Sequence, residues 1–119
     1  MAAGPTTSIR EEPYQGDVMR HFNLKGVIGK GGMGPKTLAA CQEVPGVYLH
    51  AIGGAGTLIA QAVEEVEDVL KLEFGVPEAM WVIRVNDFPV VVTMDSHGAS
   101  IHDQVEAASQ QQFEALLAR

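Results

Sequence analysis

The stretch Gly26-Val27-Ile28-Gly29-Lys30-Gly31-Gly32-Met33-Gly34-Pro35 decides the fold class of this 119-residue chain. Its first four residues form a short apolar run between turn-forming residues, which predicts a buried strand. The glycines that follow predict a turn. Pro35 suits the first position of a helix, because its missing N–H would have no helical partner there. We therefore expect a strand over 26–29, a glycine turn, and a helix over 36–43.

The same order of elements is expected a second time. Residues 46–52 predict a strand and Gly53-Gly54-Ala55-Gly56 a second glycine turn. Residues 57–65 then predict a helix with an apolar stripe of Leu58, Ala62 and Val66. Strand, turn and helix twice in succession is typical of an α/β layered domain with parallel pairing in its βαβ units.

The remaining segments complete a mixed sheet in this interpretation. A helix is expected over 9–22, after hydroxyl residues that could cap it, and a third strand over 69–74. Two β-branched runs, 80–85 and 88–94, predict an antiparallel hairpin with Trp81 as a core aromatic. A closing amphipathic helix is expected from Ile101 onward.

Composition indicates a single globular domain over residues 1–119. Hydrophobic residues make up 46% of the chain and charged residues 19%, enough to form one core. No apolar stretch is long enough for a membrane span, and the N-terminus lacks the features of a signal peptide, so we expect a cytoplasmic protein. The only cysteine, Cys41, cannot form an internal disulfide or supply the thiolates of a zinc or iron–sulfur site.

The distribution of charge favours a small anionic ligand. The net charge of −7 argues against a nucleic-acid binder, which needs clustered Lys and Arg. Residues 1–36 nevertheless hold five of the eight basic residues and have a balance of +2. Cations concentrated beside glycines predict a local anion site.

The glycine-rich stretch is a poor match to nucleotide-binding motifs. It satisfies G-x-G-x-x-G, but no carboxylate follows the second strand to hold a ribose, and Lys30 is not followed by Ser or Thr as in a P-loop. The physical basis of such motifs still applies, because glycines allow close approach and a helix start attracts anions. Lys30 is therefore a candidate anion ligand, and the alternative is an ordinary solvated lysine.

Arg10 and Thr6 are a second candidate pair. Their spacing of four residues could direct both side chains to the same space at the start of the first helix, where arginine can bind a carboxylate bidentately. The alternative is a helix cap and a surface arginine. His97 and His102, with Asp95 and Asp103, match no standard metal spacing, so no metal site is predicted. Met33 and Cys41 are interpreted as packing residues.

Several linked motifs resemble the β region of the class I, iron–sulfur-dependent hydro-lyases, a family that contains fumarate hydratase and L(+)-tartrate dehydratase. The resemblance runs in order from Gly4 to about His102. It is carried by Gly4-Pro5-Thr6-Thr7-Ser8 with Arg10, by Gly29 to Gly34, by Trp81 to Val85 leading to Phe88-Pro89, and by Asp95-Ser96-His97-Gly98. Glu11-Glu12 departs from the pair that usually follows the arginine in this family.

The resemblance implies a swivelling β/β/α-type domain that closes over a second domain or subunit. In this family that other part, the α subunit, carries a [4Fe–4S] cluster whose open iron position binds the substrate. The implied reaction is the reversible dehydration of a 2-hydroxydicarboxylate, malate to fumarate or tartrate to oxaloacetate. We expect this chain to be a β subunit of an oligomeric lyase, or the C-terminal portion of one, because the family's β region extends upstream of Gly4.

The resemblance also implies roles for five residues. Thr6 would be the catalytic residue near the proton transfer, and Arg10 and Lys30 would bind the substrate's carboxylates. Thr7 and Gly31 would line the pocket. The competing interpretation is a truncated, non-catalytic relative that serves as a structural or anion-binding module. A nucleotide-binding oxidoreductase fragment is a weaker third interpretation.

Overall fold

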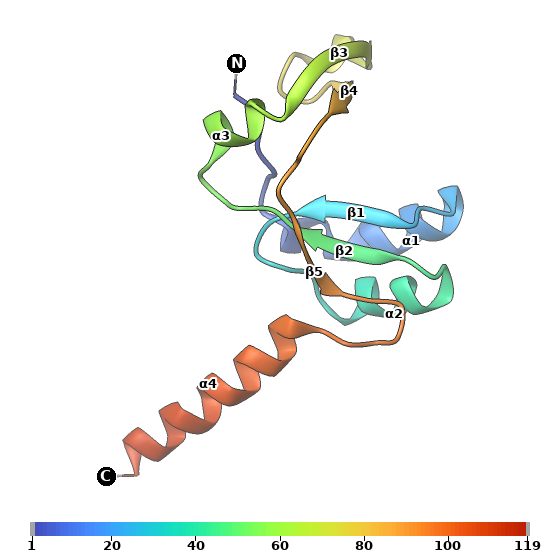
Figure 1. The fold of residues 1–119 in the computed structure, drawn as a ribbon. Helices are drawn as coiled ribbons and strands as arrows, with labels where there is room; N and C mark the ends of the chain where they lie inside the picture. Colours follow the sequence, from blue (N-terminus) through green and yellow to red (C-terminus); the bar gives the residue numbers. More distant parts are fainter. Residues whose placement is uncertain (1, 119) are drawn as a thin grey trace. The chain divides into compact units, whose positions relative to one another are not determined.

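The computed structural model describes residues 2–118 (Figure 1). Its helices are α1 (Glu12–Phe22), α2 (Pro35–Glu43), α3 (Gly56–Ala60) and α4 (Ile101–Leu117), with the 3-10 turns η1 (Ser8–Glu11) and η2 (Leu72–Phe74). Its strands are β1 (Gly26–Gly29), β2 (Val47–His50), β3 (Val63–Leu70), β4 (Met80–Val85) and β5 (Val91–Met94). The chain forms two compact units, the three-stranded unit (5–52 and 90–118) and the two-stranded unit (2–4 and 53–89).

The three-stranded unit contains a mixed sheet in the order β1-β2-β5. β1 and β2 are parallel and in register from Gly26 opposite Val47 to Gly29 opposite His50, with α2 as the connection between them. β5 is antiparallel to β2. The predicted α/β class, with a mixed sheet and a βαβ unit, is therefore confirmed. The helix predicted over 9–22 is also present, as η1 followed by α1.

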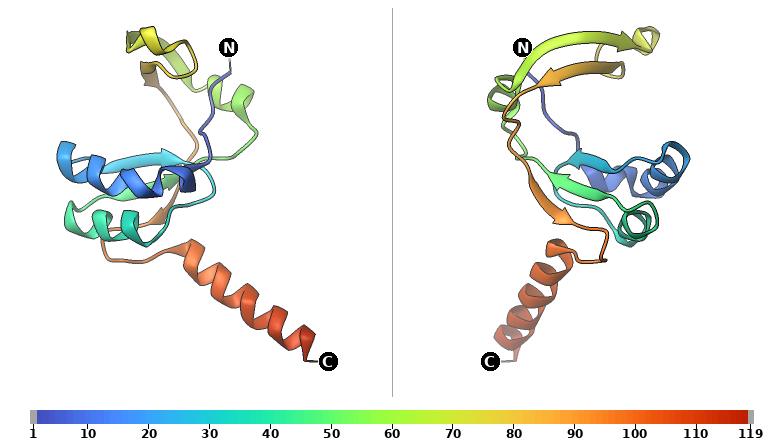
Figure 2. Two further views of the ribbon diagram at one scale, coloured as in Figure 1. Left: turned by 180° about the vertical axis from the view of Figure 1, so that it is seen from behind. Right: turned by 45° about the vertical axis from the view of Figure 1, so that its right-hand side comes forward.

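The core of this unit lies between the sheet and the helices α1 and α2, which lie side by side (Figure 2). Two clusters fill it. The first comprises Met19, Ala40 and Cys41, and the second Met33, Tyr48 and Met94. The predicted packing roles of Met33 and Cys41 are thus confirmed. The expectation that strand 26–29 is buried holds only in part, because Ile28 points away from this core and is 49% exposed.

The two-stranded unit corrects the prediction for residues 57–74. The expected helix over 57–65 ends at Ala60, and β3 begins at Val63. The expected strand over 69–74 is instead the end of β3 followed by η2. β-branched valines pair across the sheet with β4, and this tertiary pairing overrides a helical stripe that rested on three apolar residues. A second βαβ unit is consequently not formed, because β3 and β2 belong to different sheets.

The predicted hairpin of 80–85 and 88–94 is wrong. β4 pairs with β3, whereas β5 pairs with β2 in the other unit. The two strands do not pair because each has another partner: Asn86 N donates to the Ala62 carbonyl, which continues the pairing of β4 with the start of β3. β-branched runs indicate strands, but they carry no information on the partner strand.

Trp81 is not the core aromatic that the sequence predicts. It lies on β4, is 44% exposed, and its Nε1 donates to the carbonyl of Val76 at 3.1 Å. A two-stranded sheet has little of its own to bury such a side chain against.

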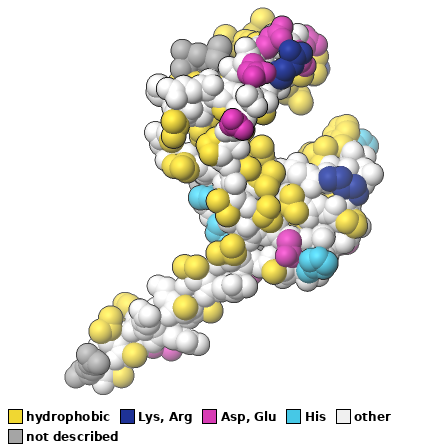
Figure 3. All heavy atoms as spheres, viewed as in Figure 1, with side chains coloured by type: hydrophobic (Ala, Val, Ile, Leu, Met, Phe, Trp, Pro, Cys, Tyr) yellow, Lys and Arg dark blue, Asp and Glu magenta, His cyan; other side chains and the backbone are white. Residues whose placement is uncertain are grey.

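Helix α4 is present as predicted, but it does not close the core. None of its residues is buried, and Phe113 and Leu116 are more than half exposed. Figure 3 shows hydrophobic side chains along its surface. Its first turn makes a tertiary contact through His102. No helix within residues 2–118 is long and apolar enough to cross a membrane.

Candidate functional site

Two segments of the three-stranded unit meet at the end of β1. Thr7 and Lys30 form a parallel β-bridge. The Ser8 amide donates to the Lys30 carbonyl at 3.3 Å, and the Lys30 amide donates to Ser8 Oγ at 2.9 Å. The segment that carries Thr6 and Thr7 is therefore fixed against the segment that carries Lys30, although more than 20 residues separate them along the chain.

Ser8 is the central residue of this junction. Its Oγ also accepts a hydrogen bond from the hydroxyl of Tyr48 at 3.0 Å. Both side chains are buried, Tyr48 completely. The hydroxyl cap predicted for the first helix is therefore wrong: no side chain caps η1 or α1, and the Ser8 hydroxyl makes a tertiary contact instead.

Four basic side chains near the N-terminal end of the unit divide into two groups. Arg20 pairs with Glu43, and Lys25 donates to Asn23 and to the Val44 carbonyl, so both serve the fold. Arg10 lies in η1 and is exposed, and Lys30 is half-buried. Within residues 2–118, no ion pair joins either of them to a carboxylate. Their charges are thus available to an external anion.

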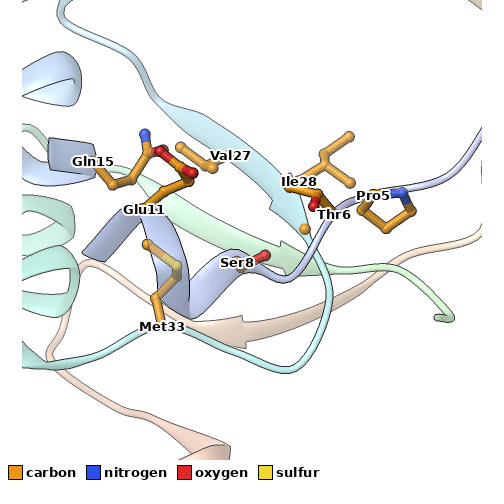
Figure 4. A pocket seen from close by; sticks show the side chains of 9 residues that line it. Pro5, Thr6, Ser8, Glu11, Gln15, Val27, Ile28 and Met33 are labelled. Carbon is orange, nitrogen blue, oxygen red and sulfur yellow. The ribbon is translucent and has the colours of Figure 1, made fainter. Parts of the chain in front are cut away.

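Two cavities flank the junction, and each is lined by one candidate residue, whereas Thr7, Arg10 and Lys30 line neither of them. A cavity of about 110 Å³ is shown in Figure 4. It is lined by Pro5, Thr6, Ser8, Glu11, Gln15, Val27, Ile28, Gly29 and Met33. A second, more open cavity of about 470 Å³ lies between Gly31 and the first turns of α4. The structure therefore brings Thr7 and Lys30 together directly, whereas Thr6 and Gly31 line different cavities.

The N-terminus of α2, where a bound nucleotide phosphate would be expected, is occupied by the chain itself. The Glu12 carboxylate accepts hydrogen bonds from the amides of Gly34 and Lys36, both at 2.8 Å, and from the amide and hydroxyl of Thr37 at 3.3 and 2.7 Å. Such amides are the groups that hold phosphates in nucleotide-binding folds. Because these amides already donate to Glu12, they are not free to hold a phosphate, which agrees with the sequence argument against nucleotide binding.

Glu12 also links stability to pH. Partial burial by itself would raise the pKa of Glu12, but the hydrogen bonds from the Thr37 hydroxyl and from the amides of Gly34, Lys36 and Thr37 outweigh it and lower the pKa. The charged form is thus favoured in the folded state. The contribution of ionised Glu12 to the free energy of unfolding is fully present above the pKa that Glu12 has in the unfolded chain. It is lost as the pH falls through the lower pKa that Glu12 has in the folded protein.

We expect Glu12→Gln to reduce the free energy of unfolding at pH 7 by about 1–2 kcal/mol, the usual range for a lost helix cap. The difference from the wild type should shrink as the pH falls through the lowered, folded-state pKa of Glu12, because the wild-type carboxylate then becomes protonated as well. Urea denaturation at several pH values measures it. Glu11→Gln, at an exposed position one residue earlier, is the control. A difference that stays constant with pH would contradict this role.

His102 lies on the other side of the glycine loop. Its Nε2 is 2.8 Å from Thr93 Oγ1, and its ring is 5.9 Å from that of His50. Burial and the neighbouring His50 lower the pKa of His102. A Cβ built on Gly32 would lie 2.7 Å from this ring, so the ring rests directly on the loop backbone.

Sequence reasoning missed Ser8, Glu12, Tyr48 and His102 as residues that shape the site. Ser8 stands inside a quoted motif, but its hydroxyl was assigned to a helix cap. For Glu12 the available signal was its departure from the family's usual residues. For Tyr48 and His102 the contacts are with residues distant in the sequence, and no local pattern reports them.

The residues of this chain do not fit an iron–sulfur cluster. Cys41 is completely buried in the core on α2, and burial, followed by the nearby Asp95, raises the pKa of its thiol. Cluster ligands are thiolates, and several are needed. Within residues 2–118 no group of three or more His, Cys, Asp or Glu side chains could hold a metal ion. A cluster in an assembled enzyme would have to be held elsewhere.

Comparison with known proteins places the chain in a family. Residues 1–105 match the family model described as Fumarase C-terminus. A Geobacillus stearothermophilus protein provisionally named fumarate hydratase class I is 64% identical over 108 residues, which are 91% of this chain and 21% of that protein.

Two further relatives carry another name. The L(+)-tartrate dehydratase subunit beta of Escherichia coli (strain K12) is 40% identical over 102 residues, 85% of this chain and 51% of the subunit. A protein of Methanocaldococcus jannaschii, provisionally given the same name, is 38% identical over 119 residues, 98% of this chain and 61% of that protein. The chain thus spans between about a fifth and three fifths of these relatives. Since the family model covers most of its length, and as the linked motifs indicate, the chain belongs to the Fumarase C-terminus family.

Proposed function

We propose that this chain is a β-type subunit, or part of one, of a hydro-lyase that reversibly dehydrates a 2-hydroxydicarboxylate. The observation that carries the proposal is the junction of Thr7 with Lys30, tied by the Ser8–Lys30 hydrogen bonds. It brings Thr7 and Ser8 against Lys30, beside η1, which carries Arg10, and within residues 2–118 neither cation makes an ion pair. The relatives' names, fumarate hydratase and L(+)-tartrate dehydratase, support water addition or removal on a dicarboxylate.

In this proposal the cations bind the substrate's carboxylates. Arg10 can bind one bidentately, and Lys30 supplies a point charge with three donors. A C–H beside a carboxylate is only weakly acidic, so removal of its proton places negative charge on that carboxylate. Fixed cations stabilise this charge more in the transition state than in the bound substrate. Thr6 would act near the transferred proton, and Thr7 and Gly31 would line the pocket.

The proposal includes a partner. Relatives named as subunits beta imply an α subunit, and we propose that it carries the [4Fe–4S] cluster that this chain cannot hold. The chain's own contribution is then restricted to binding the carboxylates, orienting the substrate and handling the proton.

The test is an anaerobic activity assay with fumarate and with tartrate. The full chain is assayed alone and after co-expression with its α subunit, with cluster loading verified by absorbance. Activity in the mixture alone supports a catalytic β subunit and identifies the substrate. Absence of activity with a loaded cluster would refute it.

A second candidate function is a non-catalytic relative that acts as a structural or anion-binding module. It shares the observation that Arg10 and Lys30 make no ion pair with a carboxylate within residues 2–118, which allows both cations to bind an anion without a reaction. Thermal stabilisation of the chain by malate or tartrate, without turnover in the loaded mixture, would support this module. Stabilisation by NAD but not by dicarboxylates would instead favour a nucleotide-binding protein.

For the lyase we expect Thr6→Ala to lower kcat by about 10²–10⁴-fold, the usual contribution of a group that assists proton transfer. KM should change little, because Arg10 and Lys30 still bind the substrate. Steady-state kinetics of the assembled enzyme measure both constants. Thr57→Ala, at an exposed threonine in α3, is the control. A rise in KM with unchanged kcat would assign Thr6 to binding rather than to proton transfer.

A further inference from the structure

The loop that carries Lys30, residues 29–32, depends on side chains from other elements for its conformation. Gly31 and Gly32 have φ values of +78° and +87°, the left-handed region that favours glycine. Two adjacent glycines give this backbone unusual freedom, so a defined position for Lys30 requires contacts from outside the loop.

On one side the loop is held by Ser8 and Tyr48. The Lys30 amide donates to Ser8 Oγ, and the buried Tyr48 hydroxyl donates to the same oxygen. The Tyr48 hydroxyl also lies against Gly29, where an added Cβ would approach it to 2.9 Å. The tyrosine therefore orients the Ser8 hydroxyl as an acceptor for the loop amide.

On the other side the loop is held by His102. The face of its ring lies against Gly32, with three ring atoms 2.7–2.8 Å from the position of an added Cβ. The ring is fixed by Nε2 at 2.8 Å from Thr93 Oγ1, and Thr93 is buried. His102, which lies on α4 and contacts Thr93 on β5, thus holds the loop against these two elements.

The two sides are in contact with each other. The Tyr48 and His102 rings meet edge-on, with centroids 6.2 Å apart and an interplanar angle of 73°. Tyr48 accordingly contacts Ser8 through its hydroxyl and His102 through its ring. Ser8, Tyr48 and His102, which we call the loop clamp, contact the loop at Gly29, Lys30 and Gly32.

We propose that the loop clamp positions Lys30, and that Tyr48 and His102 are positioning residues of the proposed carboxylate site. The inference rests on the proposed function for its catalytic consequence. Its structural part, that these side chains fix the loop, is independent of any activity. Loss of a clamp residue should therefore mobilise residues 29–32 while leaving the rest of the sheet ordered.

Amide hydrogen exchange on the full chain tests the Ser8–Tyr48 side. We expect the Lys30 amide to exchange about tenfold faster in Ser8→Ala, which removes its acceptor, and several-fold faster in Tyr48→Phe. The Val47 amide, which donates to the Lys25 carbonyl in the same sheet, is the internal control. Equal acceleration at Lys30 and Val47, or none at Lys30, would overturn the clamp.

Limited trypsin digestion tests the His102 side. Cleavage after Lys30 should become about tenfold faster in His102→Ala, because the opened loop is the substrate of the protease. Cleavage after Lys71, in the two-stranded unit, should keep its rate. His102→Gln should restore most of the protection, since its amide can still pair with the Thr93 hydroxyl. A uniform acceleration at both sites would indicate general destabilisation and refute a positioning role.

The catalytic consequence is tested in the assembled lyase. Tyr48→Phe and His102→Ala should each lower kcat/KM for the dicarboxylate by about tenfold, with His102→Gln close to wild type. Unaltered kinetics in an enzyme whose loop has become mobile would refute the link to catalysis. An inactive wild-type assembly would refute the proposed function instead, while the exchange and digestion results would still decide the clamp.

Discussion

Gly29→Ala is expected to destabilise the three-stranded unit by about 3 kcal/mol or more, the upper range for overpacking a core. Gly29 is buried at the end of β1. An added Cβ would lie 1.9 Å from Ser8 Oγ, 3.0 Å from Ser8 Cβ and 2.9 Å from the Tyr48 hydroxyl. None of these atoms is the free end of a flexible side chain, because Ser8 and Tyr48 are buried and hydrogen-bonded. The chain must therefore separate the two segments of the candidate site.

Urea denaturation gives the magnitude of this effect. The matched control is Gly26→Ala, the same substitution in the same strand, where the new Cβ would meet only Leu49 Cδ1 at 3.9 Å. A double-mutant cycle with Ser8→Gly isolates the clash, since removal of the serine side chain should recover part of the loss. Equal stabilities for the two alanine variants would contradict the packing described at Gly29.

Combined replacement of Arg10 and Lys30 by alanine should lower kcat/KM of the proposed lyase by about 10³-fold or more. Each loss removes a hydrogen-bonded charge from a carboxylate, an effect of roughly 1.5–3 kcal/mol per contact. The single variants should each lose about 10–10²-fold, and a simple sum is not expected if both cations bind the same carboxylate. The measurement is steady-state kinetics of the variant chain assembled with its α subunit.

Lys36→Ala is the matched control for these variants. Lys36 is an exposed cation on α2, six residues after Lys30, and its amide rather than its ammonium group takes part in the contact with Glu12. It should leave kcat/KM within about twofold. Arg10 and Lys30 variants that behave like Lys36→Ala would refute the assignment of these residues to the substrate site.

The sequence predicts best the part of the chain whose elements pair locally. Residues 26–52 form a strand, a glycine turn, a helix and a parallel strand, and each signal lies within about ten residues of the element it specifies. Pro35 does stand in the first turn of α2. Residues 57–74 are predicted poorly, because the apolar pattern there fits either a helix or a strand. Strands are correctly predicted within 80–85 and 88–94, but their partners are distant in the sequence and are not predicted.

The candidate site follows the same rule. Lys30 and the hydroxyl residues are recognisable from motifs, and the β-bridge between Thr7 and Lys30 then follows from the fold. The surrounding contacts are not recognisable, because the tertiary cap by Glu12 and the contact of His102 with Gly32 join residues about 25 and 70 positions apart. A residue's role in such a contact depends on the packed structure and not on its sequence neighbours.

The insertion of residues 53–89 between β2 and β5 has a consequence for the order in which the chain folds. β1, α2 and β2 can assemble from a short continuous segment, whereas β5 must close a long loop before it pairs with β2, and loop closure of this kind slows folding. His102 on α4, which contacts Thr93 on β5, can lie against the loop of residues 29–32 only after this loop closure. We therefore expect the loop of residues 29–32 to reach its final conformation only after β5 has paired with β2.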